Sequence, residues 1–370
     1  MKKKLLAVVI SLLCLLGNAQ SKDEVTILYL LPFHLNEGVN YASFRNSAEI
    51  NQVRQFEMMG FWLGAKLALQ EYEYVNIEIN VIVRDAVTSA WCLNAILNDN
   101  NLMENVDIII GPFYGSLFSL AAEFAKEHKI IIVNPFSTRF DFVENNPYVY
   151  KLTPPFLSRP EMIAQFFLDD PSEYNIILWS DSAKTPELQA YRYYFKEHGI
   201  NFREVRYLNI PQNIRKKNLI IAFFDEPTRV IHGVHTLINK DIQNTAVQNI
   251  IVVPEQWLAV SELTEDFFNL SHLYFFTNYF VDENNEAAQQ FQSDYIFYYE
   301  APAELAAYSY QGYDVTRYFI DLYFADFDHD KVQFQPLSYQ FKWEQILDGG
   351  FENIKTRFIR VKNLRLEEVD

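Results

Sequence analysis

The sequence predicts an α/β protein with two lobes, each a parallel β-sheet with helices on both faces. Short, near-continuous apolar strands alternate with amphipathic helices, with four such repeats in about 110 residues. A second series of the same kind follows the Pro-rich stretch Leu152-Thr153-Pro154-Pro155. The 370 residues also suffice for two domains of about 150 residues each.

The first series opens with the apolar, β-branched run 25–33, which is typical of a strand buried on both faces. The polar segment 34–52 lacks periodicity and is expected to be a long loop, and apolar residues at helical spacing predict a helix over 53–73. The next elements are predicted as strand 77–84, helix 89–103, strand 106–110, helix 117–127 and strand 129–133. Ligands on such sheets bind beyond the carboxyl ends of the strands, so the loops that follow the strands are expected to carry the site.

The second series is predicted from the same periodicities. Its helices are expected at 159–169, 186–198 and 227–239, and its strands at 174–179, 202–208, 219–224 and 250–253. An extended segment at 273–280, helices at 284–300 and 302–325, and β-structure at 339–343 and 356–361 complete the chain.

The N-terminus predicts export. Three lysines at 2–4 precede the apolar run Leu5–Leu16, and small residues at 17–19 favour cleavage before Gln20, so 1–19 is expected to be a signal peptide that directs the chain to the periplasm. Lipidation at Cys14 stays open as an alternative, although Leu13 stands where a lipidation signal has a small residue. No other apolar run approaches the roughly 18 residues of a membrane span, so we do not expect an integral membrane protein.

Charge and cysteine content exclude several partners. Removal of 1–19 leaves 28 basic and 48 acidic residues, a net charge of −20, which repels nucleic acid and anionic lipid. Cys92, the one cysteine left, lies in an apolar helical pattern and is interpreted as a core residue.

Five segments in order carry a family resemblance. They are Phe61–Leu69 with Arg84-Asp85, Ile109–Pro112 with Ser116, Ile131–Thr138, Tyr148–Pro154, and Phe276–Phe280 with Ala306-Ala307-Tyr308 and Gly312-Tyr313-Asp314. Together they resemble the leucine/isoleucine/valine-binding group of type I periplasmic binding proteins, over nearly all of 25–365. The stretch Gly349–Asn353 most resembles a Bacteroidetes branch, some of whose members carry a peptidoglycan-binding LysM module.

The resemblance implies two discontinuous lobes joined by three crossovers. Lobe one would comprise about 24–150 plus 274–335, and lobe two about 151–273 plus 336–370. A ligand would bind between the lobes and close them, which requires contacts to both.

The resemblance implies a zwitterionic ligand, whose carboxylate is expected to contact lobe one. By resemblance, Gly115 or Ser116 matches the first carboxylate contact and Thr138, beside Ser137, matches the second. A helix N-terminus favours an anion there, although glycine at the first position weakens carboxylate binding. The alternatives are that Ser116 is a helix N-cap and that Ser137 and Thr138 are turn residues.

The ammonium requires an acid from lobe two. Glu255, directly after the strand that ends at Val253, matches the family position, with Asp181 as a second candidate. A solvated loop acid is the alternative for Glu255. Tyr114 and Phe136 are expected to form apolar walls, or else to pack against a neighbouring helix.

Two functions follow from the resemblance. The first is a periplasmic solute receptor that delivers an amino acid or similar small molecule to an ABC permease. The second is an interaction module of the cell envelope that binds no ligand and fills its cleft with bulky residues such as Tyr114, Phe136 and Trp257. An enzyme is not expected, because nucleophile-elbow, zinc-protease and phosphate-loop motifs are missing. No cofactor or metal is expected either, since His232 and His235 lack a third ligand nearby.

Overall fold

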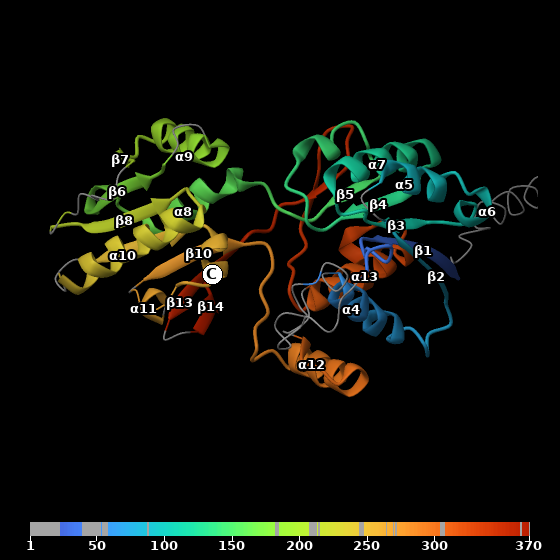
Figure 1. Ribbon diagram of the computed structural model, residues 1–370. Coiled ribbons are helices and arrows are strands. Elements are labelled where there is room, and N and C mark those ends of the chain that lie inside the picture. Colours follow the sequence, from blue (N-terminus) through green and yellow to red (C-terminus); the bar gives the residue numbers. More distant parts are fainter. Residues whose placement is uncertain are drawn as a thin grey trace, which may run out of the picture.

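The computed structural model describes residues 23–38, 53, 58–86, 89–181, 185–206, 213, 215–243, 248–263, 265–268, 270, 272–303, 308–362 and 365–369. Two seven-stranded, mostly parallel sheets form two lobes side by side (Figure 1). The predicted signal peptide with Cys14 and most of the predicted loop 34–52 lie outside the described residues. No helix in the described part of the chain is long and apolar enough to cross a membrane.

The first sheet is parallel except at one edge. Its strands, in spatial order, are β11 (Trp343–Gln345), β12 (Phe351–Asn353), β5 (Val149–Lys151), β4 (Ile131–Asn134), β3 (Ile108–Ile110), β1 (Glu24–Leu31) and β2 (Glu78–Asp85). Only β11 and β12 pair antiparallel. The inner strands are apolar runs because helices cover both of their faces.

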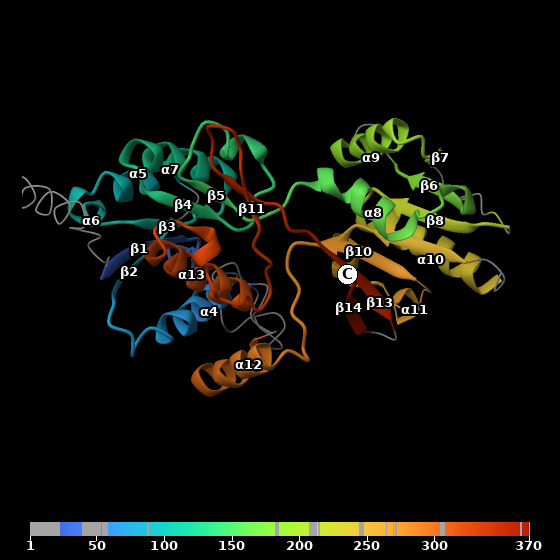
Figure 2. The same cartoon turned by 180° about the vertical axis from the view of Figure 1, so that it is seen from behind.

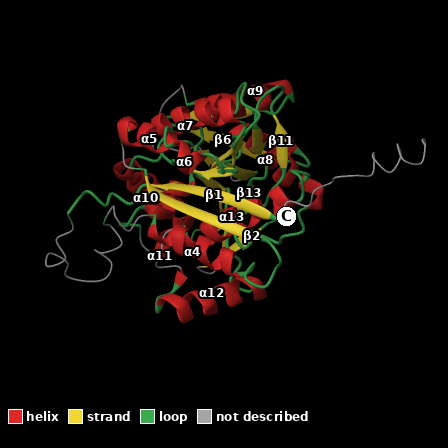
Figure 3. Cartoon of the chain, turned by 90° about the vertical axis from the view of Figure 1, so that its right-hand side faces the viewer, coloured by secondary structure: helices red, strands yellow, loops and turns green. Residues whose placement is uncertain are grey.

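Helices cover the first sheet on both sides, as Figures 1 and 3 show. One face carries α4 (Met59–Gln70) and α13 (Ser309–Phe324), and the other carries α5 (Ala90–Leu97), α6 (Asn100–Met103) and α7 (Gly115–His128). The helices α4 and α13 approach closely because each has a glycine at the contact. A Cβ on Gly312 would lie 1.9 Å from the Phe61 carbonyl oxygen, and one on Gly64 would lie 1.8 Å from that of Ser309.

The second sheet has the same design. Its order is β14 (Arg365–Glu368), β13 (Arg357–Lys362), β10 (Leu273–Thr277), β9 (Asn249–Val253), β8 (Lys217–Ala222), β6 (Tyr174–Trp179) and β7 (Phe202–Val205). The helices α8 (Arg159–Phe167) and α9 (Pro186–Glu197) cover one face, and α10 (Pro227–Gln243) and α11 (Glu265–Phe268) cover the other. Only β13 pairs antiparallel, with both β10 and β14.

The chain passes between the sheets three times: after β5, after β10 and between β12 and β13. The third crossover therefore falls at 354–356, and not at the expected position 336. The physical reason is that β12 completes the edge of the first sheet beside β5. Lys151 and Glu352 form a buried ion pair at 2.5 Å, and the Phe351 ring stacks on Tyr150 at a centroid distance of 4.7 Å.

Several predicted elements need smaller corrections. The helix expected at 89–103 is two helices, because Asp99 accepts from the backbone N–H groups of Asn101 and Leu102 and so starts α6. The helix expected from 302 begins at Ser309, and β14 was not predicted. The helix α12 (Glu286–Tyr299) contacts α4 and lies below it, at the lower edge of the first lobe in Figure 2.

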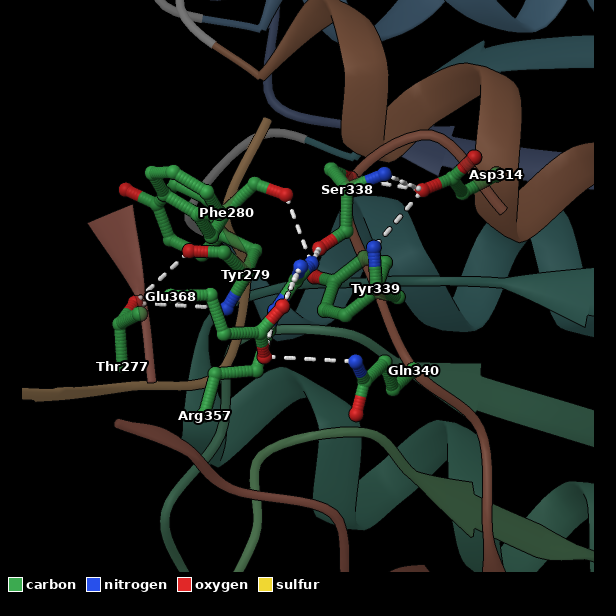
Figure 4. Close-up of polar contacts among 9 residues, drawn as sticks. All are labelled: Thr277, Tyr279, Phe280, Asp314, Ser338, Tyr339, Gln340, Arg357 and Glu368. Atoms are coloured by element: carbon green, nitrogen blue, oxygen red, sulfur yellow. Dashed lines mark hydrogen bonds and ion pairs between the residues drawn. The ribbon is translucent and has the colours of Figure 1, made fainter. Parts of the chain in front are cut away.

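Buried polar contacts fix the junction between the lobes (Figure 4). The Asp314 carboxylate on α13 accepts from the N–H groups of Leu337, Ser338 and Tyr339 at 2.7–2.9 Å and from the Ser338 hydroxyl at 2.7 Å. Arg357 donates through Nη1 to the carbonyls of Phe280 and Ser338 at 2.7 and 2.8 Å. The guanidinium thus joins two chain segments at the junction.

Candidate ligand-binding cleft

A cleft of about 890 Å³ lies between the two lobes. Both lobes and all three crossovers line it, so a ligand held there would contact both lobes. The first lobe contributes Pro32, Met58, Phe113, Tyr114, Phe136, Thr138 and Tyr308. The second lobe contributes Arg159, Glu255, Gln256, Leu258 and Ala259, and the crossovers contribute Thr153, Pro154, Thr277, Asn278, Tyr279 and Thr356.

The first-lobe side of the cleft is an aromatic wall, which we define as Phe113, Tyr114, Phe136 and Tyr308. The rings of Phe113 and Phe136 meet edge to face at a centroid distance of 4.9 Å, and Phe136 lies 4.7 Å from Tyr308. Such aromatic pairs contribute stability in addition to that from burying apolar area, so these rings pack against one another without a ligand. The wall offers a ligand a largely aromatic surface.

A buried histidine orients Tyr114. His34 is 0% exposed, and its ring nitrogens lie 3.1 Å from the Tyr114 hydroxyl and 3.1 Å from Glu37 Oε1. The turn that carries His34 is fixed by Asp85, whose carboxylate accepts from the N–H groups of Phe33, His34 and Leu35 at 2.7–3.2 Å. The hydrogen bond with the buried His34 therefore fixes the position of the Tyr114 hydroxyl.

Glu255 is the acid that the second lobe contributes to the cleft. It starts a short 3₁₀ turn, Glu255–Ala259, directly after β9. Burial raises the pKa of the Glu255 carboxyl, while the Thr277 hydroxyl at 2.9 Å and the charge of Arg159 act in the opposite direction. Among the described residues, no ion pair within 4.0 Å involves Glu255, so its carboxyl has no direct cationic partner.

Thr277 connects this acid to the junction. Its hydroxyl lies 2.9 Å from Glu255 Oε1 and 2.9 Å from the carbonyl oxygen of Tyr279, and it can donate a hydrogen bond to either oxygen. Tyr279 in turn forms an antiparallel bridge with Tyr339, which Asp314 binds. The cleft and the junction network of Figure 4 are thus continuous.

The structure brings some of the predicted site residues together and leaves others apart. Tyr114, Thr138 and Glu255 line the cleft, as does the wall residue Phe136, but whether they bind a ligand stays a prediction. Gly115 and Ser116 occupy the first turn of α7 and do not line the cleft, and Ser116 is exposed. Tyr114, and not Ser116, is the N-cap residue, and it makes no side-chain cap bond.

Three further residues have structural partners. Ser137 is a turn residue whose N–H donates to Asn134 Oδ1 at 2.8 Å and whose hydroxyl accepts from the Arg139 N–H. Asp181 pairs with Arg229 at 2.8 Å and lies outside the cleft lining. Trp257 is 0% exposed and donates to the Phe224 carbonyl, so it packs the second lobe and does not fill the cleft.

Arg159 is the main cleft residue that the sequence interpretation missed. It begins α8, directly after the first crossover, and lines the cleft opposite the aromatic wall. The only sequence signal is its position just after Pro154-Pro155, where the chain enters the second lobe. In the described part of the chain, no group of three or more His, Cys, Asp or Glu side chains is placed to hold a metal ion.

Two lobes of parallel strands, three crossovers and an interlobe cleft define the type I periplasmic-binding-protein fold. No family model matches the sequence, and no curated protein matches it. Solved structures match the fold. A putative branched-chain amino acid ABC transporter protein from Rhodospirillum rubrum aligns with a TM-score of 0.64 at 14% identity, covering 94% of this chain and 100% of that one.

Two other solved structures share the fold. An ABC transporter substrate-binding protein from Desulfitobacterium hafniense in complex with Leu aligns with a TM-score of 0.57 at 14% identity, over 94% of this chain and 100% of that chain. Full-length LpoA from Haemophilus influenzae aligns with a TM-score of 0.59 at 13% identity, over 95% of this chain and 60% of that chain. At these identities the likeness establishes the fold alone.

Proposed function

We propose that the chain is a periplasmic solute-binding protein of ABC-transporter type that takes an amino acid or similar small polar ligand into the interlobe cleft. The observation that carries the proposal is the cleft itself, about 890 Å³ in volume and lined by both lobes. Volumes of this order suit small-molecule ligands. The predicted export signal at 1–19 and delivery to an ABC permease belong to the same proposal.

The contents of the cleft support a ligand over a filled, ligand-free module. An interaction protein would be expected to plug the cleft with bulky side chains, yet Trp257 is buried within the second lobe. The wall residues Tyr114 and Phe136 line the cleft and leave it open. The likeness to LpoA keeps an envelope interaction module as the second candidate.

The test uses the mature protein, residues 20–370. Native mass spectrometry would first detect a co-purified small molecule, and a thermal-shift screen would then cover amino acids and muropeptides. We expect one ligand class to raise the melting temperature, because a molecule that binds only the native state stabilises it.

A matched pair of variants ties the effect to the cleft. Glu255→Gln removes the cleft acid and should abolish most of the shift, whereas Glu262→Gln changes an exposed acid on the same segment and should preserve it. Indifference of the wild-type protein to the whole panel would contradict the receptor proposal. A pull-down against cell-envelope proteins would then test the interaction module.

A further inference from the structure

The strand β2 forms the outer edge of the first sheet. It pairs with β1 along its whole length, and in the described part of the chain no strand pairs with its other side. An edge of eight residues presents a row of N–H and C=O groups that another strand can pair with. Because β2 lies at the opposite edge from β5 and β12, which lead into crossovers, a strand bound there would leave the crossovers free.

The pairing with β1 determines which backbone groups of β2 point outward. The N–H of Ala86 donates to the Leu31 carbonyl, in the direction of β1. Backbone groups alternate in direction along a strand, so the N–H and C=O groups of the odd-numbered residues 79–85 point to the open edge. The outward carbonyl of Val83 accepts from Nη1 of the neighbouring Arg84 at 2.9 Å, a contact within the strand that a pairing strand would replace.

The sequence of β2 is complementary to itself in the antiparallel direction. In two copies related by a two-fold axis at Val81, positions equally far before and after Val81 lie opposite each other. Glu78 then faces Arg84 of the second copy, and the symmetry creates this charge pair twice. Ile79 faces Val83 of the second copy, and the outward backbone groups of both residues form the ladder hydrogen bonds.

Charge selects this register over its neighbours. A shift by two residues, the smallest that keeps the outward groups paired, would place Glu78 opposite Ile82 or Ala86, so opposite charges would no longer meet. Opposite charges directly across an antiparallel pair are favourable, and like charges are unfavourable. Within the residues that the structure describes, neither Glu78 nor Arg84 has an ion-pair partner, so both charges are available.

Exposed apolar side chains lie at both ends of β2. Tyr74 is 97% exposed and Val75 is exposed just before the strand begins, and Trp91 is 78% exposed in the first turn of α5, soon after the strand ends. An antiparallel pair brings the start of one β2 beside the end of the other. The apolar side chains of the two copies would therefore approach one another at each end of the pair, where they would add buried apolar area.

We propose that the protein forms a two-fold symmetric dimer by antiparallel pairing of β2, which joins the first-lobe sheets of two copies into one continuous sheet. The partner is a second copy of this chain, because the charges and the backbone groups of β2 complement the same strand in reverse. The proposal is independent of whether the cleft binds a ligand.

The test is sedimentation velocity of the mature protein, residues 20–370, over a series of protein concentrations. Each mature copy has a net charge of −20, so the buffer should contain about 0.15 M salt, at which exposed charges more than about 8 Å apart are largely screened. The variants are Glu78→Arg, Arg84→Glu and the double variant Glu78→Arg/Arg84→Glu. Glu123→Arg, which makes the same charge change at an exposed position of α7, is the control.

We expect the wild type to dimerise as its concentration rises. Glu78→Arg and Arg84→Glu each place like charges opposite each other twice, so each should weaken the dimer by about tenfold or more. The double variant exchanges the charges and should return the dissociation constant to within about threefold of the wild type. Glu123→Arg should match the wild type.

Val81→Pro tests the backbone pairing. The N–H of Val81 points to the open edge, so proline there removes no hydrogen bond to β1 and is tolerated on an edge strand. It does remove the N–H that each copy donates at the two-fold axis. We expect this variant to be monomeric and to melt close to the wild-type temperature.

A wild-type protein that stays monomeric throughout the concentration series would overturn the proposal. A dimer that persists unchanged in Glu78→Arg and Val81→Pro would also overturn it, because the copies would then associate through another surface. Weakening in both single variants without recovery in the double variant would refute the charge pairing, and the proposed register would fail with it.

Discussion

Asp314 predicts how the stability of the junction depends on pH. Burial raises the pKa of this carboxyl from 3.8 to about 6, and the four donors from 337–339 limit the rise. The folded protein therefore binds this proton more tightly than the unfolded chain does. Stability from this group is complete below pH 3.8 and is lost as pH rises towards 6.

The magnitude follows from the two pKa values. A pKa of about 6 in the fold against 3.8 in the unfolded chain corresponds to about 3 kcal/mol of unfolding free energy, of which roughly 2 kcal/mol is lost between pH 4.5 and 7. Asp314→Asn cannot titrate here. It also presents an amide group to the four donors, so it should be less stable than the wild type throughout.

The assay is urea unfolding of the wild type and Asp314→Asn between pH 4.5 and 7. Other titrations cancel in the difference, so the advantage of the wild type should shrink by roughly 2 kcal/mol as pH rises. Asp169→Asn removes an exposed carboxylate and serves as the control. A difference that stays flat, or a wild-type advantage that grows with pH, would refute the reasoning, because the four donors would then outweigh burial.

Three further substitutions test the packing. Lys151→Met leaves Glu352 buried without its partner and should cost about 3–5 kcal/mol in urea unfolding, and the double variant Lys151→Met/Glu352→Leu should cost less; equal costs would argue against the pair. Gly312→Ala places a Cβ 1.9 Å from the Phe61 carbonyl oxygen and should cost at least about 3 kcal/mol or prevent folding, so a normal unfolding curve would contradict the close approach of α4 and α13. Trp257→Phe removes a buried hydrogen bond and should cost about 1–3 kcal/mol; an unchanged midpoint would show that the bond contributes nothing.

Periodicity in the sequence was enough to predict the fold class. The apolar runs at β1, β3 and β4 are unambiguous because strands buried on both faces consist mostly of apolar residues. The edge of the first sheet was not predictable, because β11 and β12 have three residues each and show no such run. In the part of the chain that the structure describes, the buried Lys151 ammonium on β5 pairs with the carboxylate of Glu352 on β12, a contact that the sequence does not reveal.

The position of the cleft and its acid Glu255 were predicted, and its arginine, Arg159, was not. Tyr114, Thr138 and Glu255 were identified because each follows the carboxyl end of a strand, a position that the topology brings to the cleft. Asp181 satisfies the same rule, but it pairs with Arg229, a contact that sequence spacing does not reveal. Arg159 follows no strand, so only the folded structure shows that it faces the cleft.

The hydroxyl of Thr277 links the charge of the cleft to the junction. It has one proton and lies 2.9 Å from two acceptors, Glu255 Oε1 and the Tyr279 carbonyl oxygen. A protonated Glu255 can donate a hydrogen bond to this hydroxyl, which then donates to the Tyr279 carbonyl. An ionised Glu255 accepts the hydrogen bond of the hydroxyl, and the Tyr279 carbonyl then loses that donor. A ligand ammonium favours the ionised form. Tyr279 bridges to Tyr339, whose N–H donates to Asp314, so the protonation state of Glu255 is linked to a hydrogen bond in the second crossover.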